Sequence, residues 1–255
     1  MEHLEVIARA KIRPGQVEGV KDQAAEIVRL TREHDTRTLR CDWFVNEDET
    51  DLEVHEMFTD EQGLAEHSTH IMEARAVLFR DYAYDHRSTL YGSVSQGFLD
   101  LVKERTGMAP SVFTFLQGLE PTARLQPSAP GAPHLELHAH MMVRPGQLEG
   151  FTSQVAEIMR LTEALDTQTI RYDWFISEDG TECEVHEVYL SGQGLVEHNT
   201  HVMDARWTLF ERYADGHRMT AFGEVSPELR ALADKHAGGL RVYAFAHGLG
   251  AAAAV

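Results

Sequence analysis

The feature that most limits how this chain can fold is an internal repeat. Trp174 follows Trp43 by 131 residues, and the same shift makes about half of the positions in 3–95 identical to those in 134–226. The matched segments include His3-Leu4-Glu5 with His134-Leu135-Glu136, Arg13-Pro14-Gly15-Gln16 with Arg144-Pro145-Gly146-Gln147, and Glu53-Val54-His55-Glu56 with Glu184-Val185-His186-Glu187. Two copies of such a long unit indicate two fused domains, because solenoids repeat many short units.

A proline-rich segment separates the two copies. Residues 121–133 contain four of the eight prolines and show no hydrophobic periodicity, which is typical of a linker. The sequence therefore predicts a first domain over 1–120, a linker over 121–133 and a second domain over 134–250.

The first part of each copy predicts a strand, a helix and a hairpin. Polar and apolar residues alternate over 4–11, which indicates a half-buried strand, and apolar residues recur at helical spacing over 17–31. Residues 38–45 and 51–58 predict two strands joined by an acidic turn.

Two helical segments are expected after the hairpin. Asp60 can cap a short helix that reaches His67, and a longer helix continues through Tyr82 towards His86. His67 and His70 would then lie on either side of a helix break. The second copy repeats this pattern.

The expected elements favour the α+β class. A last helix and an alternating strand, 240–246 in the second copy, complete the order β-α-β-β-α, then α-β. This order is typical of a ferredoxin-like antiparallel sheet with helices on one face, whose other face needs a cover. We therefore expect two ferredoxin-like domains packed as an intrachain pseudo-dimeric α+β barrel, in which the fusion replaces a homodimer. Whether chains associate into a further homo-oligomer is left open.

Charge and cysteine usage exclude several classes of partner. The chain has 23 Lys and Arg against 41 Asp and Glu, a formal net charge of −18, which would repel a nucleic-acid backbone. No basic-then-apolar leader and no long apolar window is present, so we expect a cytoplasmic protein without a membrane partner. Cys41 and Cys183 occupy non-equivalent positions in the two copies and are expected to be buried free thiols.

Several short motifs recur in the same order in both copies. They are Pro14-Gly15, Glu56, Gly63-Leu64, His67 and His70 in the first copy, and Pro145-Gly146, Glu187, Gly194-Leu195, His198 and His201 in the second. In this order they resemble the antibiotic biosynthesis monooxygenase family, whose members form ferredoxin-like dimeric α+β barrels. The likeness covers roughly the first 85 residues of each copy, while Asp42-Trp43-Phe44 and the segment after Ser95 depart from the family pattern.

The resemblance implies oxygenation without a metal, flavin or haem. An electron-rich phenol or quinol would lose a proton and itself reduce molecular oxygen, so no cofactor is expected. Family members that degrade haem carry an asparagine on the first strand, where this sequence has Ala8 and Ala139. Haem degradation is therefore not expected, and the expected partners are a small aromatic substrate and molecular oxygen.

Four histidines are the candidate catalytic residues: His67, His70, His198 and His201. An imidazole with a pKa near neutrality suits a general base at the mouth of a pocket. The alternative is a structural role, because a histidine beside a helix end often bonds only backbone carbonyls or the helix dipole.

The expected wall of the substrate pocket is aromatic and carries one cation in each copy. The candidates are Trp43, Phe58, Arg75 and Tyr82 in the first copy, and Trp174, Tyr189, Arg206 and Tyr213 in the second. The aromatic residues could equally be core. Arg75 could hold a substrate anion or pair with Glu56, a carboxylate among apolar neighbours.

A histidine cluster in the second copy offers a rival function. His138, His140 and His186, with Glu184, could lie on one face of neighbouring strands and bind zinc, iron, nickel or copper. The alternative is an interdomain polar network, because the first copy has Ile7 and Arg9 in place of two of these histidines.

The sequence thus favours a cofactor-independent monooxygenase that oxidises an aromatic or polyketide-like phenol or quinol. A metal-dependent oxygenase using the second-copy histidines is one alternative. A non-catalytic small-molecule-binding protein or a cyclase is another, because one fold can host many functions.

Overall fold

The computed structural model describes residues 3–107, 109–119, 134–223, 225–227, 229–231 and 240–249. The expected linker, 121–133, lies outside the described residues. The chain forms two compact units: unit 1 contains Met1–Val112 and Tyr243–Val255, and unit 2 contains Phe113–Val242. Tertiary contacts define these units, so the division of the sequence into 1–120, a linker and 134–250 stays a prediction.

Unit 1 is built on the first copy of the repeat. Its elements are β1 (Leu4–Ile12), α1 (Val17–His34), β2 (Thr38–Asn46), β3 (Asp51–Phe58), α2 (Glu61–His70), α3 (Met72–Val77), the π-helical turn η1 (Leu78–Tyr82), β4 (Ala83–Tyr91) and α4 (Gln96–Thr106). Strand β10 (Leu240–Gly248) belongs to this unit from Tyr243 onward.

Unit 2 is built on the second copy. Its elements are β6 (Leu135–Val143), α5 (Leu148–Leu165), β7 (Thr169–Ser177), β8 (Glu182–Tyr189), α6 (Gly192–Arg212) and β9 (Ala214–Phe222). Strand β5 (Ser111–Gly118) belongs to this unit from Phe113 onward. The last strand of each copy is therefore part of the unit built on the other copy.

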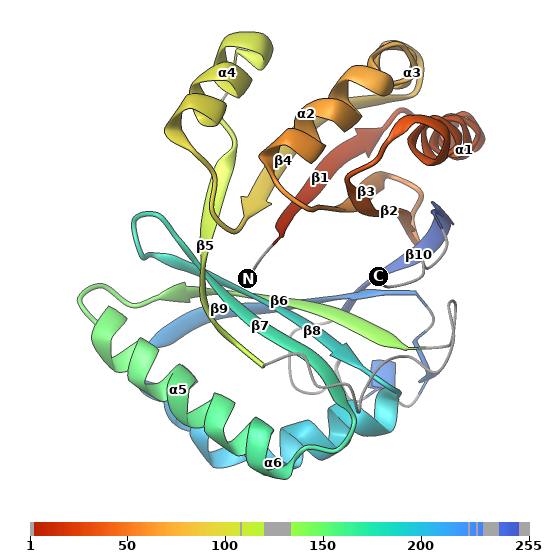
Figure 1. Ribbon diagram of the computed structural model, residues 1–255. Helices are drawn as coiled ribbons and strands as arrows, with labels where there is room; N and C mark the ends of the chain where they lie inside the picture. The colour runs from red at the N-terminus through yellow and green to blue at the C-terminus, as the bar shows by residue number, and fades with distance from the viewer. Residues whose placement is uncertain are drawn as a thin grey trace. The chain divides into compact units, whose positions relative to one another are not determined.

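Each unit contains an antiparallel sheet with the strand order of a ferredoxin-like fold. In unit 1 the order is β4-β1-β3-β2, and β10 pairs with the remaining side of β2. In unit 2 the order is β9-β6-β8-β7, and β5 pairs with β7. The α+β class expected from the sequence is confirmed (Figure 1).

The fourth strand of each sheet corrects the expected element order. His86 lies on β4 and His217 on β9, whereas the sequence pattern placed both near the end of a helix. Residues 240–246, expected to close the sheet of the second copy, contribute instead to the pairing with β2. The segment Ala83–Tyr91 alternates poorly between polar and apolar residues, so its pairing with β1 decides that it is a strand.

Helices cover one face of each sheet. In α1, Val20 and Ile27 are 1% exposed and share a hydrophobic cluster with Trp43, Val54 and Leu78. Each such side chain contributes about 1.5–3 kcal/mol when it is removed from water. Figure 1 shows α5 and α6 side by side on the equivalent face of unit 2, where a matching cluster forms.

The helix break differs between the copies. In unit 1 the chain leaves α2 at Ile71, after both His67 and His70, so these histidines do not lie on either side of the break. In unit 2 the equivalent residue, Val202, is buried inside the continuous helix α6. The predicted break between the two histidines is therefore wrong in both copies, although Asp60 does cap α2 by accepting a hydrogen bond of 2.9 Å from Gly63 N.

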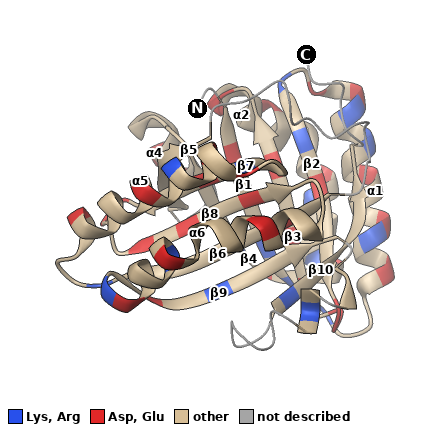
Figure 2. Ribbon diagram, turned by 90° about the horizontal axis from the view of Figure 1, so that it is seen from below, with Lys and Arg blue, Asp and Glu red and all other residues tan. Residues whose placement is uncertain are grey.

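The outer face of α1 carries charges of both signs. Glu18 pairs with Lys21, and Arg29 pairs with Glu26 and Glu33, which gives the alternating red and blue bands of α1 in Figure 2. These are exposed pairs one helical turn apart, and solvent screens exposed pairs, so they contribute little to stability. Within the described residues, no helix has both the length and the apolar composition needed to cross a membrane.

A glycine in α5 tests the packing of this helix against the end of α6. A Cβ at Gly150 would overlap the ring of Tyr213, lying 2.9 Å from its Cδ1 atom. We expect Gly150→Ala to lower the free energy of unfolding by about 1–3 kcal/mol through overpacking, measured by urea unfolding. Gly192→Ala, whose Cβ would meet nothing within 4 Å, is the matched control and should change little. A Gly150→Ala protein as stable as the parent would contradict this packing.

Candidate functional site

A buried aspartate in unit 1 holds two histidines. Asp35 directly follows α1, and its side chain is 1% exposed. Its two carboxylate oxygens each lie 2.7 Å from an imidazole Nδ1, one of His67 and one of His70. Thr38 donates a further hydrogen bond of 2.6 Å. The two histidines are three residues apart on α2, so both face the same carboxylate.

Unit 2 repeats this arrangement. Asp166 directly follows α5, and its oxygens lie 2.7 Å from Nδ1 of His198 and of His201. Thr169 donates the additional hydrogen bond, as Thr38 does in unit 1. The side chain of His198 is 3% exposed and that of His201 is 27% exposed. The four candidate histidines are therefore held by carboxylates through Nδ1. These contacts orient the rings and leave Nε2 as the nitrogen that can contact another group.

His67 also contacts a second carboxylate. Its Nε2 lies 3.1 Å from Oε1 of Glu56, on β3. Burial disfavours the imidazolium, but the hydrogen bonds to Asp35 and Glu56 outweigh burial and raise the pKa of His67 to about 9. Glu56 thus bonds His67 on α2, whereas the sequence suggested Arg75 as its partner.

The equivalent glutamate in unit 2 has a different partner. Glu187 accepts a hydrogen bond of 2.8 Å from the hydroxyl of Tyr189, whose counterpart in unit 1 is Phe58. Burial raises the pKa of Glu187, against the opposing effects of His198, Tyr189 and Arg206. The equivalent glutamates of the two copies therefore have different hydrogen-bond partners, an imidazole in unit 1 and a phenol in unit 2.

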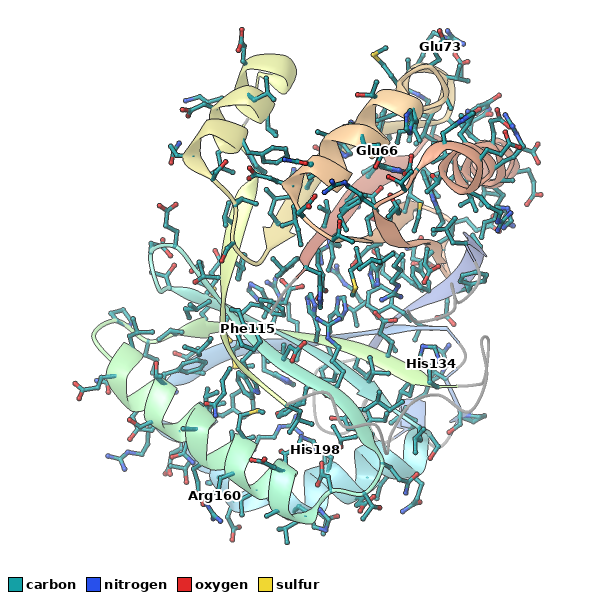
Figure 3. The ribbon with its side chains drawn as sticks, viewed as in Figure 1. Glu66, Glu73, Phe115, His134, Arg160 and His198 are labelled. Carbon is teal, nitrogen blue, oxygen red and sulfur yellow. The ribbon has the colours of Figure 1, made fainter. Side chains whose placement is uncertain are left out.

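A small cavity lies in unit 2 beside His198. Its volume is about 20 Å³, which is enough room for about one water molecule. Its lining includes Tyr172, Trp174, Glu187, His198, Arg206 and His217. Figure 3 shows His198 on α6, on the side of that helix that faces the sheet of unit 2. Three ionisable groups other than His198 thus meet aromatic rings at one buried place.

Two groups in the cavity have properties that suit binding of an oxygen-containing molecule. Burial, with the nearby charge of Arg206, lowers the pKa of His217 to about 4, so its imidazole is neutral at physiological pH. The buried Nε1–H of Trp174 has no acceptor within the described residues. An unbonded buried N–H costs about 1–3 kcal/mol, which a ligand oxygen can recover.

The other predicted wall residues lie in different surroundings. Tyr82 and Tyr213 pack beside Gly19 and Gly150 of the covering helices. Phe58 is fully buried and contacts the ring of His67, and Tyr189 contacts the ring of His198 in the same way. The cavity of unit 2 is not lined by Phe58, Tyr82, Tyr189 or Tyr213. Arg75 lies over the ring of Phe79. Of the predicted second-copy residues, Trp174, Arg206 and His198 line the cavity.

The histidine cluster on the sheet of unit 2 assembles in part. Ligand atoms of His138, Glu184 and His186 lie within 4.8 Å of one another, whereas His140 contacts Glu182 at 2.8 Å. The rings of His138 and His186 stack at 4.0 Å with planes 14° apart. Each imidazole binds a metal through a lone pair in its own ring plane, so one ion cannot lie in both planes. In this arrangement the residues do not fit a metal.

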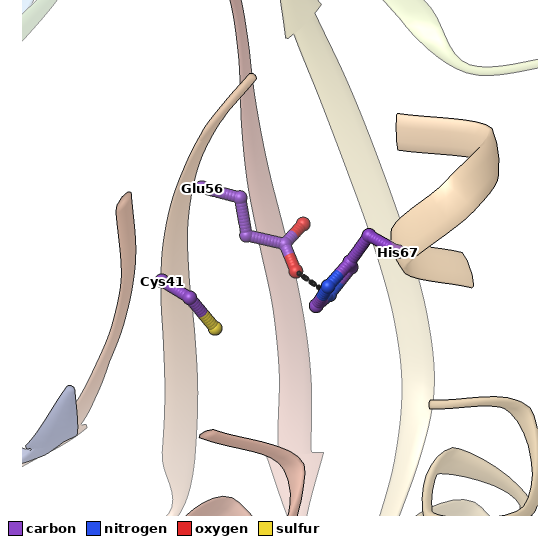
Figure 4. A group of neighbouring side chains, drawn as sticks. All are labelled: Cys41, Glu56 and His67. Carbon is purple, nitrogen blue, oxygen red and sulfur yellow. Dashed lines mark hydrogen bonds and ion pairs between the residues drawn. The ribbon is translucent and has the colours of Figure 1, made fainter. Parts of the chain in front are cut away.

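A second group of metal-ligating side chains occurs in unit 1. Ligand atoms of Cys41, Glu56 and His67 lie within 4.8 Å of one another. Figure 4 shows the three side chains converging from β2, β3 and α2. Both cysteines of the chain are buried free thiols, as expected.

Sequence reasoning missed Asp35 and Asp166, and it placed a weaker candidate, His217, on a helix although it lies on a strand. Asp35 and Asp166 recur in identical Asp-Thr pairs, so their equivalence was visible, although their contact with the histidines was not. His217 recurs as the counterpart of His86, but a strand assignment for 214–222 would have been needed to aim it at the cavity.

Comparisons with solved structures identify the fold. No protein-family model and no curated protein matches the sequence. The structure is similar to a "putative monooxygenase" from Fusobacterium nucleatum, with 12% identity, a TM-score of 0.61, and coverage of 85% of this chain and 89% of that chain. A second "putative monooxygenase", from Lactobacillus acidophilus, has 12% identity, a TM-score of 0.57, and coverage of 86% and 92%.

A third neighbour spans the whole chain. An "anthrone oxidase-like protein" has 10% identity, a TM-score of 0.53, and coverage of 100% of this chain and 98% of that chain. At these identities the likeness shows the fold alone. That fold is ferredoxin-like, as the order of the predicted elements indicates.

The contacts of His67 predict a pH-dependent stability. Its pKa is about 9 in the folded protein and about 6.5 when unfolded, so its stabilisation is complete below pH 6.5 and is lost as pH rises to 9. We expect the free energy of unfolding to fall over this range by on the order of 3 kcal/mol. Urea unfolding of the parent and of His67→Gln, in buffer containing a chelator, measures the difference.

The control for this experiment is His70→Gln. It removes the other imidazole on Asp35 but leaves the contacts of His67 with Asp35 and Glu56. The slope between pH 6.5 and 9 should persist in this control and disappear in His67→Gln. An unchanged slope in His67→Gln would show that another group titrates.

Proposed function

We propose that this protein is a cofactor-independent monooxygenase that oxidises an electron-rich aromatic phenol or quinol in the cavity of unit 2. The observation that carries the proposal is the Asp166–His198 pair. His198 lines a cavity whose wall also includes Tyr172 and Trp174. The fold shared with proteins named as monooxygenases supports it. The reaction needs a base, an anion site and an aromatic pocket, and this cavity offers a residue for each.

His198 is the proposed base. Asp166 accepts the Nδ1 proton at 2.7 Å, which leaves Nε2 as the atom that can take a proton from the substrate. The same geometry orients histidine in other acid–base sites, where the carboxylate stabilises the imidazolium that forms. His201 bonds the other oxygen of Asp166 but is not among the residues that line the cavity.

Arg206 and Trp174 are the proposed partners of the substrate oxygen. Arg206 lies at the cavity wall above the ring of Phe210 and bonds Asn199. Its positive charge would stabilise the substrate anion in surroundings of low dielectric. The Nε1–H of Trp174 would donate a hydrogen bond to the same oxygen, which supplies the missing acceptor.

Substrate binding requires the cavity to enlarge. Small-molecule pockets typically measure about 300–1,000 Å³, whereas this cavity has room for about one water. Met141, Met219, Arg206 and Phe210 line it with side chains that can change rotamer. We propose that an aromatic ligand displaces these side chains and excludes water from the oxygen chemistry.

Anthrone is the probe substrate that one of the structural neighbours suggests. Oxidation of its methylene group to a carbonyl removes two hydrogens and four electrons. One oxygen atom of O₂ enters the product, anthraquinone, and the other leaves as water, so the substrate supplies all the electrons. No external reductant is required by this balance.

Oxygen consumption with anthrone tests the proposal. We expect His198→Ala to lower turnover by about 10²–10⁴-fold, as for the loss of a general base, while the protein stays folded. His201→Ala removes the imidazole on the other Asp166 oxygen and should lose less. Turnover should persist in the parent after treatment with a chelator and without added flavin or nicotinamide.

Two results would contradict the assignment. Full turnover in folded His198→Ala, with loss in His201→Ala, would move the base outside the cavity. Binding of anthrone without oxygen consumption would indicate a non-catalytic binding protein. Incorporation of one labelled oxygen atom from ¹⁸O₂ into anthraquinone would show that the new carbonyl oxygen comes from O₂ and not from water.

A further inference from the structure

Unit 1 differs from unit 2 at the position where a thiol meets the histidine and the glutamate. Cys41 in unit 1 corresponds to Tyr172 in unit 2, while Glu56 and His67 correspond to Glu187 and His198. The thiol of Cys41 is fully buried. Unit 1 therefore contains a sulfur, an oxygen and a nitrogen ligand where unit 2 has a phenol, and the proposed oxygenation in unit 2 makes no use of this group.

We propose that Cys41, Glu56 and His67 bind one borderline divalent metal ion, such as Zn²⁺, in unit 1. Tetrahedral zinc bonds of about 2.0–2.3 Å place neighbouring ligand atoms about 3.3–3.6 Å apart. The Nε2 of His67 lies 3.1 Å from Oε1 of Glu56, close to that spacing. All three ligand atoms lie within 4.8 Å of one another, so a small movement of the sulfur towards the other two ligand atoms completes the set.

The surroundings of His67 match those of a metal-bound histidine. Its Nδ1–H is directed to Asp35 at 2.7 Å, which leaves Nε2 on the side of Glu56 and Cys41. Histidines that bind metals almost always donate their other ring N–H to such a carboxylate. Asp35 is itself held by Thr38 and His70, so the ring orientation is built in.

The charge of the cluster allows an ion to replace protons. Ligation of a metal requires an unprotonated Nε2 on His67 and a thiolate on Cys41. A divalent ion would displace the Nε2 proton of His67 and the thiol proton of Cys41. Two positive charges would enter and two protons would leave, so the net charge of the buried cluster would not change.

The ligand types select the class of metal. Thiolate and imidazole favour borderline ions such as Zn²⁺ and Co²⁺ over Mg²⁺ and Ca²⁺, which prefer oxygen. Three protein ligands leave a fourth position for water. Binding would join β2, β3 and α2, and would therefore raise the thermal stability of the protein by mass action.

Co²⁺ titration of the untagged, chelator-treated chain tests the proposal. A cobalt–thiolate bond produces a charge-transfer band in the near ultraviolet that nitrogen and oxygen ligands do not produce. We expect this band to saturate at one Co²⁺ per chain and to vanish in Cys41→Ser. Cys183→Ser is the matched control, because Cys183 is the other buried thiol and lies in none of the described ligand groups.

Two further measurements do not depend on replacing the thiol. Asp35→Asn should weaken Zn²⁺ binding by about 10–100-fold, the usual effect of losing the partner of a metal-bound histidine. At neutral pH the parent should release about two protons for each Zn²⁺ bound, measured in weakly buffered solution. Circular dichroism checks that the variants are folded.

The absence of a thiolate band in the parent would overturn the proposal. So would a band that survives in Cys41→Ser, or Zn²⁺ binding without proton release. None of these results bears on anthrone oxidation, because the proposed oxygenation uses His198 and Arg206 of unit 2. Failure of the metal site and failure of the proposed function are therefore distinguishable.

Discussion

The buried carboxylate that follows the first helix of each repeat is the interaction on which the candidate sites depend. Asp35 and Asp166 lie at the junction between this helix and the second strand. Each contacts two histidines of the neighbouring helix, α2 in unit 1 and α6 in unit 2. A buried carboxylate without partners would be unstable, so the histidines hold its charge and the carboxylate holds their rings. This reciprocal arrangement fixes Nε2 of one histidine in the interior of each unit.

The two copies use this scaffold differently because a few neighbouring residues have changed. In unit 1, Cys41 and Phe58 surround His67, and Glu56 bonds the imidazole directly. In unit 2, tyrosines replace both residues, and the hydroxyl of Tyr189 donates a hydrogen bond to Glu187. The thiol presents a soft ligand, whereas the phenols add aromatic wall and proton donors. One duplicated fold can thereby hold two kinds of chemistry.

Sheet pairing explains why the repeats share strands. β2 and β7 each have one side that is not paired by the four strands of their own ferredoxin-like sheet. In both units the last strand of the other copy bonds that side, which satisfies backbone groups that would otherwise form an open edge. Hydrophobic alternation identified these last strands, but alternation contains no information about which edge a strand will join.

The sequence alone determined the duplication, the amphipathic helix over 17–31, the hairpin strands and the α+β class, because each depends on local periodicity or on self-similarity. It also singled out His198, Arg206 and Trp174 by their recurrence. Tertiary structure decided that 83–91 and 214–222 are strands, that Asp166 holds His198, and that His217 lines the cavity. These features depend on contacts between residues distant in sequence, and local pattern cannot specify which carboxylate meets which histidine or which side chain closes a cavity.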